Sequence, residues 1–251
     1  MLKKLLRGGA RRIREWLQDE PTEQTAVIEN QPRYQWLNDQ FMKLSQEIGQ
    51  KKHYVWGVIQ GAGLAQVLGV RRISVIEFGV AGGNGLVALQ DIAIRAEKLF
   101  DIKIDVYGFD SGAGLPKPTD YRDMPHFFAE GFYPTDTGKL HPRLHKGNLQ
   151  LGQIESTISD FISSKPAPVA FISFDLDYYS STMHAFALLE ADQNLLLPRI
   201  HCYFDDILGF SYSDFTGELL AIADFNAAHS MRKISKIQGL QYFLPPGPPK
   251  M

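Results

Sequence analysis

Short, nearly continuous apolar runs alternate with stretches of helical periodicity along most of the chain. The first run, Ile73 to Phe78, is rich in β-branched residues, as in a strand covered on both faces of a parallel sheet. Further strand-like runs lie at 103–109, 142–146, 168–174 and 199–204, and two closing candidates lie at 232–237 and 240–244. Helical patterns lie between the first five runs and after them, at about 86–100, 152–164, 181–194 and 214–229.

This alternation predicts right-handed crossovers and therefore an α/β fold with a Rossmann-like, doubly wound, mostly parallel sheet of seven strands. Gln238-Gly239 separates the two closing candidates and predicts a tight hairpin, so the last strand is expected to be antiparallel. In such a sheet ligands bind outside the carboxyl ends of the strands. Polar residues that follow the apolar runs are therefore the candidates for chemistry.

The chain before the first strand has a different character. Helical patterns at about 34–48 and 52–68 predict an N-terminal helical extension of the α/β domain, which we expect to span residues 34–251. Residues 1–33 form a basic N-terminal segment and a polar tether. The first 14 residues carry six basic side chains and no acid, so this segment is +6 and the rest of the chain is −8. The segment predicts a short amphipathic helix, either as a solvated tail or as a weak contact for a membrane surface or partner.

Composition narrows the class of protein. Of the 251 residues 44% are hydrophobic and 22% are charged, which is typical of a soluble globular protein. No run approaches the roughly 18 apolar residues of a transmembrane helix. Cys202 is the single cysteine, which excludes an internal disulfide and favours a reducing, cytoplasmic location. The acidic body argues against nucleic acid as a partner, because phosphates need a basic surface.

A glycine-rich turn follows the first predicted strand. It begins at Gly79, two residues after Glu77, and leads into a helix whose free N–H groups face a ligand. The third and sixth positions of a dinucleotide fingerprint are here Ala81 and Asn84, so that fingerprint fails, and an acid before the turn would repel a pyrophosphate. Glu77 is expected to orient the turn and, through water, a ligand's amino group. A plain strand-to-helix turn is the alternative.

Asp110 ends the second predicted strand, where a carboxylate can accept hydrogen bonds from both ribose hydroxyls. A simple capping role is the alternative. Together with a turn that does not fit a dinucleotide, a ribose-binding acid indicates a nucleoside without phosphates. S-adenosylmethionine is the ligand that fits best.

Three acidic residues form a second group at the carboxyl ends of two strands. Asp175 follows the fourth run, and Asp205 and Asp206 follow the fifth, so their side chains can converge. Clustered oxygen donors favour a hard cation, and Mg²⁺ is the expected metal. The alternative is that one of the pair caps a loop. Asp177 is expected to point away from Asp175 and to be structural, as the cap of a helix near Ser180.

Four runs resemble the class I S-adenosylmethionine-dependent methyltransferases and, within them, the macrocin O-methyltransferase family. They are EFGVAGGNG, YGFDSGAGLP, SFDLDYYSST and YFDD, in this order, and they cover roughly residues 73–206. Gly112-Ala113 stand where that family usually has an aromatic-acidic pair. The resemblance implies the same Mg²⁺ ligands, Asp175, Asp205 and Asp206. It also implies cofactor contacts from Glu77, Gly79 and Gly83 near the methionine part, from Asp110 near the ribose and from Gly147-Asn148 near the adenine. Ala81, Ser111 and Asp175 are further expected cofactor contacts.

The expected activity is O-methylation of a hydroxyl on a small molecule or glycan. Asp175 is the expected catalytic residue through the metal, and His126, in the long segment 111–140, is the candidate base. An aromatic wall for the acceptor is expected from Phe210, Tyr212 and five aromatic residues of that segment: Tyr121, Phe127, Phe128, Phe132 and Tyr133. Packing of these rings against the domain's own helices is the alternative. Methylation of nitrogen or nucleic acid, and a non-catalytic scaffold of the same fold, are the competing functions. A homodimer through the N-terminal helices is a further prediction.

Overall fold

The computed structural model describes residues 32–209, 212–237 and 240. Two compact units, residues 1–42 and 43–251, are distinguished within the chain. The described part of the first unit is the beginning of helix α3 (Pro32–Ile48), so the predicted boundary at residues 33 and 34 falls inside this helix. The predictions for the basic segment, for the tether before Pro32, for strand 240–244 beyond its first residue and for Phe210 lie outside the described residues.

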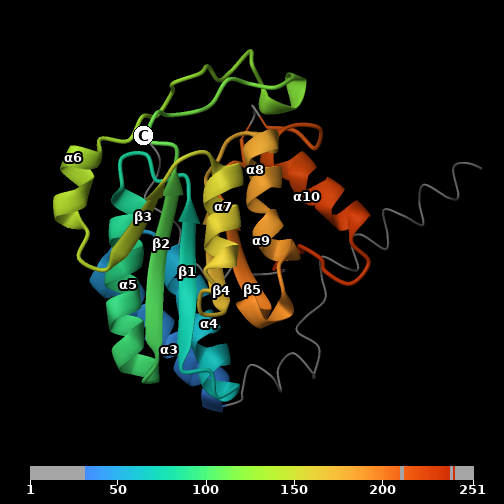
Figure 1. Cartoon of the computed structure of the whole chain (residues 1–251). Helices are drawn as coiled ribbons and strands as arrows, with labels where there is room; N and C mark the ends of the chain where they lie inside the picture. Colours follow the sequence, from blue (N-terminus) through green and yellow to red (C-terminus); the bar gives the residue numbers. More distant parts are fainter. Residues whose placement is uncertain (1–31, 210–211, 238–239, 241–251) are drawn as a thin grey trace, which may run out of the picture. The chain divides into compact units, whose positions relative to one another are not determined.

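The second unit contains a parallel sheet of five strands in the order β3-β2-β1-β4-β5 (Figure 1). The prediction of a parallel α/β sheet is thereby confirmed. The strands are β1 (Arg72–Phe78), β2 (Lys103–Asp110), β3 (Gly147–Leu151), β4 (Val169–Phe174) and β5 (Leu196–Phe204). Reversal of strand order on either side of β1 places the carboxyl ends of β1, β2 and β4 next to one another, which is where ligands bind in this architecture.

Residues 232–237 are described and do not form the predicted sixth strand. The reason lies in their hydrogen bonds. The backbone N–H of Ile234 donates to Asn226 Oδ1, and its carbonyl accepts from Asn226 Nδ2. Arg232 donates to the carbonyls of Leu189 and Ala191. The segment is therefore held against helices by side chains, and the described residues show neither the seven-stranded sheet nor its antiparallel last strand.

The third strand begins five residues later than predicted, at Gly147 instead of residue 142. Residues His141–Arg143 form a 3₁₀ turn, and Gln90 Oε1 then accepts the backbone N–H groups of His145, Lys146 and Gly147 at 3.1 to 3.2 Å. Gln90 is fully buried, so its amide takes the place of a neighbouring strand for this stretch. The chain joins β2 only after it has passed Gln90.

Helices cover both faces of the sheet (Figure 1). Helices α4 (Lys52–Val67) and α5 (Asn84–Phe100) pack together on one face. Helices α7 (Ile154–Ser163), α8 (Tyr179–Ala185), α9 (Ala187–Glu190) and α10 (Gly217–Ala228) lie on the other. The helix predicted over 181–194 is thus two helices followed by a 3₁₀ turn, Gln193–Leu195. None of the helices in the described part of the chain combines the length and hydrophobicity that a membrane crossing requires.

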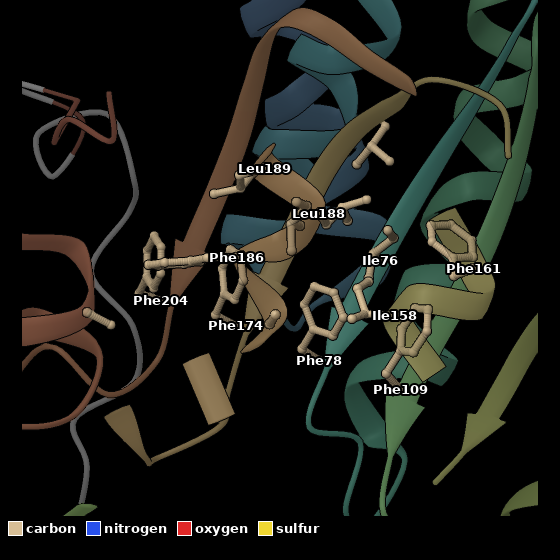
Figure 2. Close-up of a cluster of buried hydrophobic side chains, with 14 of the residues drawn as sticks. Ile76, Phe78, Phe109, Ile158, Phe161, Phe174, Phe186, Leu188, Leu189 and Phe204 are labelled. Atoms are coloured by element: carbon tan, nitrogen blue, oxygen red, sulfur yellow. The ribbon is translucent and has the colours of Figure 1, made fainter. Parts of the chain in front are cut away.

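A row of buried phenylalanines lies directly beneath the carboxyl ends of the strands (Figure 2). Phe78, Phe109, Phe174 and Phe204 end or nearly end β1, β2, β4 and β5, and the rings of Phe174 and Phe204 stack at 4.6 Å. Burying each ring contributes about 1.5 to 3 kcal/mol. Because this apolar layer fixes the strand ends, the polar residues that follow it start from defined positions.

Candidate functional site

A cavity of about 440 Å³ opens at the carboxyl ends of the strands. It is lined by the glycine turn after β1, the end of β2, the segment after β2, the loop after β3 and the acidic loops after β4 and β5. Seven predicted site residues line this one cavity: Gly79, Ala81, Asp110, Ser111, Asp175, Asp205 and Asp206. Four other predicted residues are absent from its lining: Glu77, Gly83, His126 and Asn148.

Asp110 supports the glycine turn. Its Oδ2 accepts the backbone N–H groups of Val80 and Ala81, both at 2.9 Å, and its Oδ1 accepts that of Gly112 at 2.7 Å. These are the bonds expected of a cap, and yet the residue also lines the cavity. A carboxylate offers about four acceptor positions, so roughly one is left for a ligand hydroxyl.

Gly79 brings the main chain close to the loop after β4. Its φ of 82° lies in the left-handed region, and a Cβ at this position would overlap the carbonyl oxygen of Asp175. A side chain is therefore excluded twice, by conformation and by space. The turn therefore brings the backbone that follows β1 against the backbone that follows β4, and both residues line the cavity.

Glu77 lies beneath the turn and not in the cavity. Its side chain is 2% exposed, and its Oε1 accepts a hydrogen bond of 2.7 Å from the Tyr54 hydroxyl of α4. The Ser173 hydroxyl in turn donates to the Tyr54 oxygen at 2.8 Å. Burial is the main cause that raises the pKa of Glu77 to about 8. Since side chains alternate along β1, Glu77 faces α4 and α5 while Phe78 faces the opposite layer.

Gly83 and Asn148 lie outside the cavity lining for separate reasons. Gly83 precedes α5, and the Leu140 side chain occupies the space that its Cβ would take. Asn148 is an exposed residue near the start of β3, opposite Tyr107, because the strand begins later than predicted. The residues that follow β3 and line the cavity are Gly152, Gln153 and Ile154.

His126 is exposed, although Phe127 and Phe128 beside it line the cavity. In the same segment Phe132 and Tyr133 also line it, as does Tyr212 from the loop after β5, whereas Tyr121 does not. The segment folds back on itself through Leu115, whose N–H donates to the Phe132 carbonyl at 2.7 Å. Four of its five predicted aromatic residues thus form one wall of the cavity.

Asp175, Asp205 and Asp206 offer one carboxylate oxygen each within 4.8 Å of one another. Burial raises the pKa of Asp175 to about 7, with further contributions from the charges of Asp205 and Asp206. Asp205 is exposed, and its Oδ1 accepts the Tyr203 hydroxyl at 2.7 Å. Asp206 is buried and accepts from the Tyr212 hydroxyl at 2.8 Å. An arrangement of three oxygen donors that repel one another fits a hard divalent cation.

The prediction that Asp177 is structural and faces away is wrong. Strand β4 ends at Phe174, and Asp177 has a φ of 58°, so the alternation of a strand no longer applies and its side chain lines the cavity. Burial and the charge of Asp206 raise its pKa. The N-cap position of helix α8 is Tyr178, and the Ser180 N–H in its first turn donates to Asp123, a residue distant in sequence, at 2.8 Å. The end of the apolar run at Phe174 was the signal that alternation stops there.

Comparison with solved structures identifies proteins of the same architecture. The calicheamicin methyltransferase CalS11 is similar over 78% of this chain and 86% of its own, with a TM-score of 0.50 and 20% identity. An apo structure of CalS11, described as a TDP-rhamnose 3′-O-methyltransferase, has a TM-score of 0.42 at 20% identity over the same shares. The O-methyltransferase NovP is similar over 54% of this chain and 58% of its own, with a TM-score of 0.41 and 17% identity.

Neither a protein-family model nor a curated protein sequence matches this chain. At 20% identity the likeness to CalS11 concerns the fold, and it agrees with the resemblance expected from the four sequence runs. The described chain has a fold like that of the methyltransferase CalS11.

Proposed function

We propose that this protein transfers a methyl group from S-adenosylmethionine to a hydroxyl group of a small molecule or sugar. The observation that carries the proposal is the shared cavity: the glycine turn and Asp110 line it together with the oxygen cluster of Asp175, Asp205 and Asp206. A cofactor site and a site for an oxygen nucleophile are thereby adjacent. The fold of a known methyltransferase supports the same reaction class.

Several residues of the chain are suited to hold the cofactor. Gly79 and Ala81 present backbone without bulky side chains, and Asp110 retains acceptor capacity for a ribose hydroxyl. Gln153 and Ile154, which follow β3 and line the cavity, take the role near the adenine that was expected of Asn148. When bound, S-adenosylmethionine supplies a methyl group on a positively charged sulfur. The carboxylates of the cavity favour that positive charge.

The acceptor's proton needs a base that does not hold the metal, and Asp177, which lines the cavity outside the expected ligand set, is best placed to take it. In the reaction the bond between acceptor oxygen and methyl carbon forms, the bond between sulfur and that carbon breaks, and the hydroxyl proton must leave. His126 is exposed and outside the cavity lining, so we do not retain it as the base.

Magnesium is part of the proposal because the donor set suits it. Asp175, Asp205 and Asp206 would hold the ion, and its charge would lower the pKa of an acceptor hydroxyl and orient it. Removal of one ligand should then weaken metal-dependent turnover more than cofactor binding.

Calorimetry tests the proposal most directly. S-adenosylhomocysteine should bind the purified protein, and a screen of hydroxylated acceptors with a labelled methyl donor should reveal transfer that Mg²⁺ stimulates. The variant Asp205→Asn should lose more than about tenfold of that transfer while it binds S-adenosylhomocysteine normally. Asp214→Asn, at another exposed aspartate, is the matched control.

Absence of S-adenosylhomocysteine binding at millimolar concentration would refute the proposal. Cofactor binding without transfer to any acceptor would favour the non-catalytic scaffold. Transfer that EDTA does not affect would remove the metal and retain the methyltransferase.

A further inference from the structure

The aspartates of the oxygen cluster stand on two separate loops. Asp175 belongs to the residues that connect β4 to α8, and Asp205 and Asp206 belong to those that follow β5. The Asp177 N–H donates to Asp206 Oδ2 at 3.0 Å, and where the loops begin the Asp205 N–H donates to the Phe174 carbonyl at 3.0 Å. Further contacts between the loops also set the distance between the carboxylates.

Glu218, the second residue of α10, connects both loops. Its Oε2 accepts the N–H of Asp206 at 3.1 Å, and its Oε1 accepts the N–H of Leu176 in a longer bond of 3.4 Å. One of these donors belongs to a cluster residue, and the other belongs to the neighbour of Asp175. Glu218 is fully buried and is not part of the cavity lining, so it acts from behind the loops.

A close approach of α10 makes this bridge possible. Gly217 has a φ of 55°, and a Cβ there would stand only 3.1 Å from the Asp177 carbonyl oxygen. The helix thus begins against the loop after β4. Burying a carboxylate near other acids costs free energy of desolvation and repulsion, which an apolar residue at this position would avoid. The two hydrogen bonds offset part of that cost.

We propose that Glu218 is a positioning residue that holds the loops of Asp175 and Asp206 at the spacing a divalent cation needs. The metal part of this inference rests on the proposed function. Groups behind metal ligands commonly change metal affinity by about 10- to 100-fold when they are replaced. Glu218 would hold the metal ligands in place indirectly, through its hydrogen bonds from the N–H groups of Leu176 and Asp206.

The test is Glu218→Gln. A glutamine amide keeps the size of the side chain, yet its NH₂ group cannot accept a hydrogen bond, so one backbone N–H loses its partner. Titration with MgCl₂ should show roughly 10- to 100-fold weaker binding, while the affinity for S-adenosylhomocysteine stays the same. Glu130→Gln, at an exposed glutamate, should change neither. A general loss of stability would not separate the two ligands in this way.

Amide hydrogen exchange without metal tests the bridge itself. In the wild-type chain the amides of Leu176 and Asp206 should exchange slowly, and in Glu218→Gln at least one should exchange faster by about tenfold or more. Equal amide exchange rates in the two proteins would overturn the inference. If the variant does not fold, the wild-type protein alone decides: rapid exchange of both amides would overturn the inference. Equal Mg²⁺ affinity would also overturn it. Wild-type protein that binds no Mg²⁺ but shows the exchange difference would refute only the metal in the proposed function.

Discussion

At the scale of the residue, the largest departure from expectation is Glu77. The sequence places an acid two residues before the glycine turn, and this spacing does not reveal which side of β1 the acid faces. Tyr54, which binds it, comes from a helix 23 positions earlier in the chain. Because the partner is distant in sequence and the network is buried, only the structure shows that Glu77 supports the site from below.

The variant Tyr54→Phe tests this network. It removes the hydroxyl that donates to Glu77 and accepts from Ser173, all within the core. Leaving those groups unpaired should lower the free energy of unfolding by about 1 to 3 kcal/mol in urea titrations. Tyr121→Phe, at a residue that is 67% exposed, should leave stability within about 0.5 kcal/mol. Similar losses in both variants would argue against the network.

At the scale of the element, the predicted bounds of β1, β2 and β4 agree with the structure within one residue. β1 and β4 are apolar runs buried on both faces, whereas β2 alternates buried with partly exposed positions. β3 was missed because it is only half-buried and its start depends on Gln90, which lies on α5. The acidic residues after β4 and β5 were predicted from the apolar runs that precede them. The direction of Asp177 was not, because it depends on the turn of the backbone after Phe174.

The turn between β1 and α5 gives a matched pair of glycine variants. Gly79→Ala forces a side chain into the left-handed region and onto the Asp175 carbonyl, so it should cost more than about 4 kcal/mol or prevent folding. Gly82→Ala meets no atom within 4 Å and should change stability by less than about 1 kcal/mol. Thermal unfolding of the two variants measures the difference. Equal tolerance at both positions would contradict the geometry described for the turn.

At the scale of the whole molecule, the parallel α/β sheet follows from the alternation of apolar and helical patterns. The closing strands do not follow in the same way, because residues 232–237 bind Asn226 and helix ends instead of a strand. Homodimer formation and cytoplasmic location stay predictions. So does the division of the chain at residues 33 and 34.

Buried acids should give the whole protein an unusual pH dependence. The folded pKa values of Glu77, about 8, and Asp175, about 7, lie above those of the unfolded chain, and the pKa values of Asp177, Asp206 and Glu218 are also raised. The folded state therefore binds more protons, and stability should fall as the pH rises through about 7 and 8. Below pH 6.5 the buried His53 and His201, with pKa values lowered to about 4, oppose this trend.

Thermal unfolding between pH 6.5 and 8.5 checks this expectation. The midpoint should decline across the range, and Glu77→Gln should reduce the decline because it removes one of the titrating groups. MgCl₂ should raise the midpoint more at pH 8.5 than at pH 6.5, since a cation binds the deprotonated carboxylates. A midpoint that rises over this range would contradict the raised pKa values of Glu77 and Asp175.

The way Gln90 holds the start of β3 has a consequence for the order of folding. A half-buried edge strand carries little information about its own register, and here a buried amide on α5 defines where it begins. We therefore expect α5 to dock on β1 and β2 before the edge of the sheet is completed. Replacing Gln90 should slow the last stage of assembly and leave the first strands unaffected.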